Sequence, residues 1–172
     1  IVAMNDVGYN LLGAWRQTTG PLGRDLLLSS AASLAEMEAR GPNLFQHEAL
    51  KEGLPRLMGM GFTIDEVAKN AMTLPFADER RLEQGIAAPG AAPRCYRLIR
   101  RRVGFAGMAA AIKALSELAD GLEAAGSWQL YTAYQTTTGD RREISEMWIT
   151  DEITRDWYPQ AAPAAALAAF DA

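Results

Sequence analysis

Two side chains that often carry catalysis or bind metals each occur once in this sequence, as His47 and Cys95. One cysteine cannot form a disulfide within the chain, and one cysteine with one histidine is too few for a Cys/His zinc or iron–sulfur site. Glu48 follows His47, but Lys51 stands where a zinc-protease motif requires its second histidine. We therefore predict no such metal site, and a haem held by His47 as axial ligand is the one metal-dependent alternative.

Several common enzyme classes leave no trace in the sequence. It contains no Gly-x-Ser-x-Gly elbow, no Walker phosphate loop and no Gly-x-Gly-x-x-Gly fingerprint. These absences argue against an α/β-hydrolase, a P-loop nucleotidase and a Rossmann oxidoreductase.

Basic residues gather in one segment of an otherwise acidic chain. The net charge is −4, whereas nucleic-acid binders usually present a basic face, so we predict no nucleic-acid partner. Two interpretations of the cluster remain open: charges on an edge strand that discourage pairing, and a clamp for an anion or carboxylate at the mouth of a pocket. The cluster comprises Arg94, Arg97, Arg100, Arg101 and Arg102.

Composition favours a globular chain. Of the 172 residues, 49% are hydrophobic and 22% are charged, and no apolar run approaches the ~18 residues of a membrane-spanning helix. We expect no membrane partner. The single cysteine, with no signal sequence ahead of the first element, favours the cytoplasm.

An internal repeat is the most informative feature of the sequence. Residues 9–20 align with residues 128–139 at an offset of 119, and five positions are identical. Each copy is rich in β-branched and aromatic residues, ends at a glycine and precedes a second apolar run, at 25–29 and 144–149. We therefore predict two β-hairpins. The identical residues of the first copy are Leu11, Ala14, Thr18, Thr19 and Gly20.

The elements around the second hairpin predict a ferredoxin-like half. A strand over residues 94–103 precedes a helix over 105–125, in which apolar residues recur at spacings of three and four. The order strand, helix, strand, strand is that of a split βαβ unit. The first half has its hairpin and then helical stretches from residue 31, but lacks the opening strand and helix.

The middle of the chain predicts the link between the halves. Residues 63–66 form a capping box that opens a helix to Met72, and residues 70–76 are the candidate fourth strand of the first half. Residues 86–93 are rich in Gly, Ala and Pro and read as a linker. We thus expect an α+β protein with halves at 1–85 and 94–172, the second ending in an Ala-rich helical tail.

Short motifs in the second half carry a family resemblance. The resemblance rests on Tyr96-x-Leu98, on Val103-Gly104 and on the glycine turn at Gly139, with Trp148 nine residues later. The second half resembles the NIPSNAP-like proteins of the dimeric α/β-barrel superfamily. The resemblance covers residues 94–155, and residues 7–30 show a weaker form of it. It implies two ferredoxin-like halves whose sheets close around a cavity, within the chain or across a homodimer.

Strand alternation indicates which side chains could line such a cavity. It places Leu11, Trp15 and Gln17 on one face of the first hairpin, and their counterparts Leu130, Tyr134 and Thr136 on the equivalent face of the second. A face that mixes aromatic rings with amides and hydroxyls suits a pocket wall, although the same rings could be core residues. We predict catalytic roles for Tyr134, Gln17 and His47, and ligand contacts for Trp15, Arg97, Thr136, Gln135 and Trp148.

Three functions remain open at this point. In the first, a cofactor-independent isomerase, cyclase or oxygenase acts on a small hydrophobic metabolite. Tyr134, Gln17 and Gln135 would then polarise a carbonyl or stabilise an enolate, with Arg97 or His47 as charge or proton partner. The second is a non-catalytic binding or interaction protein, as many NIPSNAP-like proteins look to be. The third is a haem protein through His47.

Overall fold

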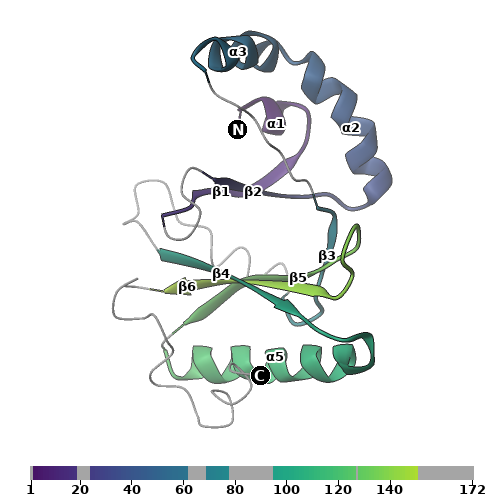
Figure 1. The fold of residues 1–172 in the computed structure, drawn as a ribbon, viewed down its shortest axis with the longest axis vertical. Coiled ribbons are helices and arrows are strands. Elements are labelled where there is room, and N and C mark those ends of the chain that lie inside the picture. The colour runs from purple at the N-terminus through teal and green to yellow at the C-terminus, as the bar shows by residue number, and fades with distance from the viewer. Residues whose placement is uncertain (1, 19–23, 62–68, 78–94, 127, 151–172) are drawn as a thin grey trace. The chain divides into compact units, whose positions relative to one another are not determined.

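The computed structural model describes residues 2–18, 24–61, 69–77, 95–126 and 128–150, and the chain divides into two compact units between Ala68 and Lys69. The described residues form two antiparallel sheets and four α-helices (Figure 1), so the α+β class is confirmed. The predicted linker at 86–93, the capping box at 63–66 and the C-terminal tail lie outside the described residues.

The described residues of the first unit form the first predicted hairpin and three helices. Strands β1 (Asn10–Arg16) and β2 (Asp25–Ser30) pair antiparallel, and the helices are α1 (Val2–Asp6), α2 (Leu34–Gln46) and α3 (Glu48–Gly59). The Ser33 hydroxyl caps α2 by accepting a bond from the backbone N–H of Glu36, at 3.1 Å. The hairpin and the helices after residue 31 are thus confirmed.

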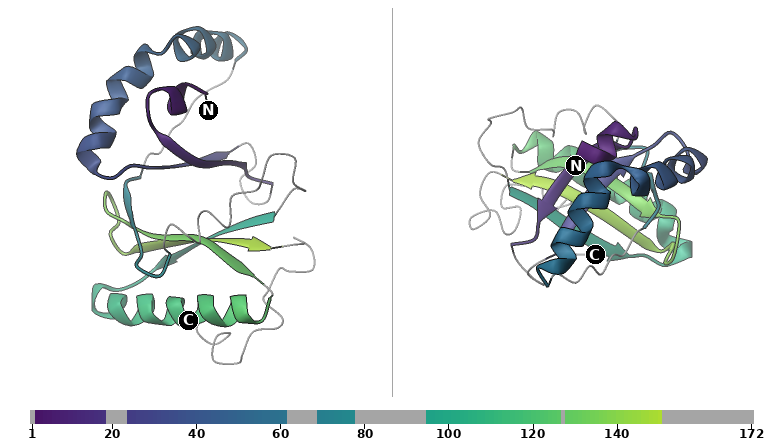
Figure 2. Two further views of the ribbon diagram at one scale, coloured as in Figure 1. Left: turned by 180° about the vertical axis from the view of Figure 1, so that it is seen from behind. Right: turned by 90° about the horizontal axis from the view of Figure 1, so that it is seen from above.

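The described residues of the second unit form a four-stranded antiparallel sheet with a helix on one face (Figures 1 and 2). Its elements are β3 (Ala71–Thr73), β4 (Cys95–Arg102), the 3-10 helix η1 (Phe105–Gly107), α5 (Met108–Ala124), β5 (Gln129–Thr136) and β6 (Glu143–Thr150). The strand order is β3-β5-β6-β4, so β6 lies between two strands that α5 connects. This split βαβ arrangement is compatible with a ferredoxin-like fold.

Strand β3 departs from the expectation for the first half. The predicted short strand exists, but it pairs with β5 of the second unit, with Thr73 opposite Tyr134. Met72 belongs to this strand, so the prediction that a helix extends to Met72 was wrong. The backbone groups of β5 therefore have strand partners on both sides.

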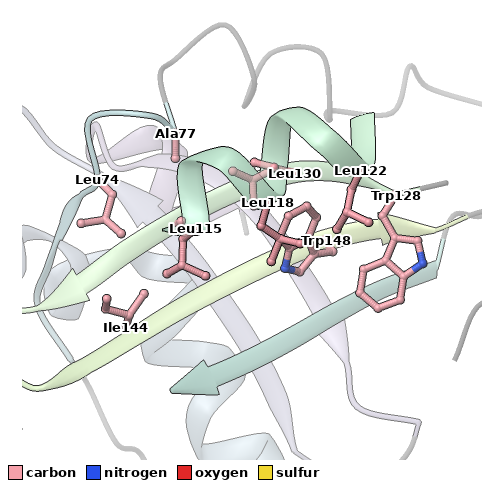
Figure 3. Packing of buried hydrophobic residues seen from close by; sticks show 11 residues of the cluster. Leu74, Ala77, Leu115, Leu118, Leu122, Trp128, Leu130, Ile144 and Trp148 are labelled. Atoms are coloured by element: carbon pink, nitrogen blue, oxygen red, sulfur yellow. The ribbon is translucent and has the colours of Figure 1, made fainter. Parts of the chain in front are cut away.

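The hydrophobic core of the second unit lies between α5 and the sheet (Figure 3). Leu115, Leu118 and Leu122 recur along one face of the helix and are almost fully buried. The strands contribute Leu130, Ala133, Ile144 and Trp148 to the same cluster, and Leu74, Ala77, Ala119 and Trp128 complete it. The face of the sheet that packs on α5 is thereby fixed.

The two hairpins share one pairing register. Every registered pair of β1 and β2 maps onto a pair of β5 and β6 when 119 is added to both residue numbers. Both hairpins also have a register shift at the same place, after Leu11 and after Leu130. The prediction that Trp15 and Tyr134 are equivalent is confirmed, because their partners Leu26 and Ser145 are also 119 residues apart.

Candidate functional site

The β-bulge at Tyr131 determines which side chains of β5 lie on which face. Leu130 pairs with Trp148 and belongs to the core under α5, whereas Thr132 pairs with Met147 and lies on the opposite face. The prediction that Leu130 shares a face with Tyr134 was therefore wrong, because a bulge shifts the alternation by one residue. We call the face opposite α5 the distal face. Its strand residues include Tyr96, Leu98, Arg100, Arg102, Thr132, Tyr134, Thr136, Glu143, Ser145, Met147 and Ile149.

One end of the distal face is apolar. Met147 and Ile149 are 1% and 5% exposed, and Leu98, which pairs with Met147, is 40% exposed. The rings of Tyr96 and Tyr131 meet edge to face with centroids 5.8 Å apart. Burial raises the pKa of Tyr131 to about 12, so its hydroxyl is neutral at physiological pH. Met147, Ile149 and Tyr131 are covered here, and Leu98 is the apolar side chain of this end that is exposed.

The other end of the distal face carries polar groups in a single row across four strands. Thr73, Tyr134, Ser145 and Arg100 are successive pairing partners on β3, β5, β6 and β4. Burial raises the pKa of Tyr134, and a hydrogen bond with the Ser145 side chain opposes that shift. Tyr134 therefore presents a neutral hydroxyl that can donate a hydrogen bond.

A pocket lies beside this row, near the turn between β5 and β6. Its volume is about 330 Å³, and it is lined by Arg100, Arg101, Arg102, Asp140 and Glu143. Glu143 accepts a hydrogen bond from Lys69 Nζ at 2.6 Å and lies 3.5 Å from the Thr136 hydroxyl. Thr136, predicted as a ligand contact, thus belongs to the same polar end as Tyr134.

Three other predicted ligand residues lie on the α5 side of the sheet. Trp148 is 1% exposed within the core, and its Nε1 donates a hydrogen bond to Glu146 at 3.0 Å. The Arg97 guanidinium lies 5.1 Å from the centre of the Trp128 ring, in cation–π geometry. Gln135 pairs with Ile144, and its amide donates to the Arg141 carbonyl at 2.9 Å. These side chains therefore do not share the face of Tyr134.

The remaining predicted residues belong to the first unit. The Trp15 ring lies across Gly13, where a Cβ would approach ring atoms within 2.3 Å, so glycine is required for this close approach. The Gln17 side chain is exposed, and its backbone N–H donates to the Arg24 carbonyl at 2.9 Å.

His47 joins two helices. It ends α2 and caps α3, where its Nδ1 accepts a hydrogen bond from the Ala49 backbone N–H at 3.3 Å. Its Nε2 lies 3.2 Å from an Asp6 carboxylate oxygen. Both ring nitrogens are thus engaged, which does not fit an axial haem ligand. Among the described residues, no cluster of three or more His, Cys, Asp or Glu could hold a metal ion.

Sequence patterns did not point to some residues at the polar end of the distal face. Arg100 was singled out with the arginine cluster, but Ser145, Lys69 and Thr73 were not, because their proximity depends on the pairing of distant strands. The buried carboxylate of Glu146, fully covered under α5, was also missed. An alternating pattern in a strand places a residue on a face but does not identify its neighbours on other strands.

Comparison with known proteins identifies no relative of this chain. No protein-family model matches the sequence, and neither the curated proteins nor the solved structures include a significant match. The resemblance to NIPSNAP-like proteins, the closed barrel and the homodimer therefore stay predictions. Across the part of the chain that the structure describes, no helix has the length and apolar character needed to span a membrane.

Proposed function

We propose that the chain binds a small hydrophobic metabolite on the distal face and that Tyr134 donates a hydrogen bond to a carbonyl or enolate oxygen of that molecule. The observation that carries this proposal is the row of Tyr134, Ser145 and Arg100 beside an apolar end of the same face. Ligand sites typically combine apolar area with a few polar anchors in this way.

The chemistry follows from the charge at this end of the face. A neutral tyrosine hydroxyl near a guanidinium stabilises negative charge that develops on an oxygen atom. A cofactor-independent isomerase, cyclase or oxygenase needs such stabilisation, because its substrate passes through an enolate or a related anion. Tyr134 is thus the electrophilic residue in this proposal, and Arg100 supplies positive charge.

Binding without catalysis is the second candidate, and one observation favours it. Glu143 is the one carboxylate among the described strand residues of the distal face, and its Oε1 is ion-paired with Lys69 at 2.6 Å. The hydrogen bond from Lys69 occupies this carboxylate oxygen, so the oxygen is less available to accept a proton from a ligand. Among the described residues, Tyr134 and Arg100 can thus stabilise an anion, whereas Glu143 is poorly placed to act as a base. This contrast favours binding without catalysis.

The test compares two variants that each lose one hydroxyl. Tyr134→Phe removes the donor from the distal face, whereas Tyr9→Phe removes a hydroxyl that donates to the Met37 carbonyl at 3.1 Å in the first unit. Each variant should lose about 0.5–1.5 kcal/mol of stability, since each breaks one hydrogen bond. Native mass spectrometry then measures how much of any copurified small molecule each variant retains.

The outcomes separate the two candidate functions. We expect Tyr134→Phe to bind the copurified molecule about three- to tenfold more weakly and Tyr9→Phe to bind it as wild type does. Equal retention by both variants would refute the site. In D₂O, an enzyme that forms an enolate exchanges the adjacent carbon-bound proton, so deuterium uptake by the bound molecule supports catalysis and its absence supports binding alone.

A further inference from the structure

We infer that the pocket beside the polar row binds the anionic group of the ligand and that Arg100 is its anchor, so the ligand is a hydrophobic carboxylate or a comparable acid. This inference rests on the proposed function and specifies its substrate class. The exposed side chain of Leu98, two residues before Arg100 on the same face of β4, would contact the hydrophobic part of the same molecule.

Among the described residues around the pocket, cationic side chains outnumber carboxylates. Five cationic side chains accompany three carboxylates in this part of the chain, and each of these carboxylates has a basic partner. Arg102 Nε donates to Asp140 at 2.6 Å, and the bonds of that carboxyl with Arg142 and Arg102 hold its pKa well below the usual range. The groups are Lys69, Arg100, Arg101, Arg102 and Arg142 against Asp140, Glu143 and Glu146.

Arg100 differs from the other arginines that line the pocket. Arg101 is paired with the buried Glu146, at 2.6 Å, and Arg102 with Asp140. Among the described residues, no carboxylate forms an ion pair with Arg100. A guanidinium in this situation can accept a bidentate carboxylate without giving up an existing ion pair.

The strand geometry sets the size of the ligand. Tyr134 and Arg100 lie on β5 and β4, with Ser145 of β6 between them. Neighbouring strands are ~4.8 Å apart, so the two backbones are separated by about 10 Å, and both side chains rise from the same face. A molecule of moderate size can therefore contact the Tyr134 hydroxyl with one polar group and the Arg100 guanidinium with its acidic group.

Two fluorescent probes that differ only in charge test this inference. Anilinonaphthalene sulfonate carries an anionic group, and N-phenyl-naphthylamine is its neutral analogue. We expect wild type to bind the sulfonate at least tenfold more tightly than the neutral probe, and Arg100→Gln to remove most of this difference. Arg100→Lys should restore part of it, because the charge is kept and the bidentate geometry is lost.

A matched control separates a local site from the general effect of positive charge. Arg141 is exposed, and its Nε donates to the Thr137 carbonyl, so Arg141→Gln changes the net charge by the same amount outside the pocket lining. Affinity for the sulfonate should be unchanged in this variant. Equal loss in both variants would overturn the assignment of Arg100, as would equal affinity of wild type for the two probes.

Failure of this inference differs from failure of the proposed function. If the neutral probe binds wild type and is displaced by the copurified molecule, but Arg100→Gln changes nothing, the distal face binds neutral ligands and only the anionic class is wrong. If neither probe binds to wild type, both the proposed function and the inference are refuted. Circular dichroism spectra that match wild type confirm that each variant is folded.

Discussion

The buried carboxylate of Glu146 provides the sharpest test of the packing described above. It is 0% exposed under α5, where one oxygen accepts from Arg101 Nε at 2.6 Å and the other from Trp148 Nε1 at 3.0 Å. Burial raises the pKa of Glu146, whereas the charge of Arg101 opposes that shift. A separate donor faces each oxygen, and the ionised carboxylate is the stronger acceptor for both donors.

The variant Glu146→Gln keeps the shape of the side chain and removes this match. Its amide has one acceptor oxygen, so its NH₂ group must face either Arg101 or Trp148. One of these two donors then loses its acceptor on residue 146, which costs ~1–3 kcal/mol, and the guanidinium of Arg101, whose side chain is 18% exposed, loses the negative charge of Glu146. Breaking a buried ion pair in this way typically costs about 3–5 kcal/mol in total.

Urea denaturation followed by circular dichroism measures this loss, with Glu117→Gln as the matched control. Glu117 pairs with Lys113 on α5 at 3.7 Å, and both side chains are more than two-thirds exposed. The control should cost only about 0.3–0.5 kcal/mol. If Glu146→Gln costs no more than Glu117→Gln, the buried ion pair described here is not a feature of the folded protein.

A second variant keeps the reasoning falsifiable if Glu146→Gln does not fold. The repeat places Leu27 where the second hairpin has Glu146, so leucine is compatible with this strand position. Replacing Glu146 and Arg101 together by leucine removes both charges, and such replacements are often neutral or stabilising. We expect this double variant to be more stable than Glu146→Gln, and the opposite order would contradict the argument.

Two further variants test local features of each unit. Gly13→Ala places a methyl group within 2.3 Å of the Trp15 ring and should cost ~1–3 kcal/mol in thermal melts, whereas Gly53→Ala has open space and should stabilise α3 by about 0.5–1 kcal/mol. Equal effects would show that the Trp15 ring does not cover Gly13. Because the pKa of Asp140 is lowered on folding, mainly by Arg142, its stabilising effect is present above the unfolded pKa of ~3.9 and is lost as pH falls below it. Asp140→Asn should therefore destabilise the protein at pH 7 but little at acid pH, and a constant difference in urea titrations across this range would refute the linkage.

Local sequence signals predicted the elements of this fold well. The two hairpins, the strand that became β4 and the helix that became α5 were all expected within a few residues of their observed bounds. Their patterns are short-range, because alternation and three-to-four spacing depend on neighbouring residues. The repeat also carried information about how the strands pair. The two copies share residue types at one offset, and the two hairpins have the same pairing register.

The candidate site was predicted less completely, for a physical reason that the bulge illustrates. Alternation alone placed Leu130 with Tyr134, and the extra residue Tyr131 separated them. Trp148 was predicted to contact a ligand, but its position in the alternation of side chains along β6 places it on the face that packs on α5. A bulge depends on how two strands meet, so neither strand reveals it alone. Tyr134 and Thr136 kept their predicted common face because both follow the bulge.

The pairing of β3 with β5 has a consequence for the order in which the chain can assemble. Thr73 and Tyr134 are 61 residues apart, whereas the partners Trp15 and Leu26 of the first hairpin are separated by 11. Translation adds about 5–20 residues per second, so β3 leaves the ribosome roughly 3–12 s before its partner strand exists. The first hairpin can close during that interval, while β3 must await the synthesis of β5 before its hydrogen bonds are complete.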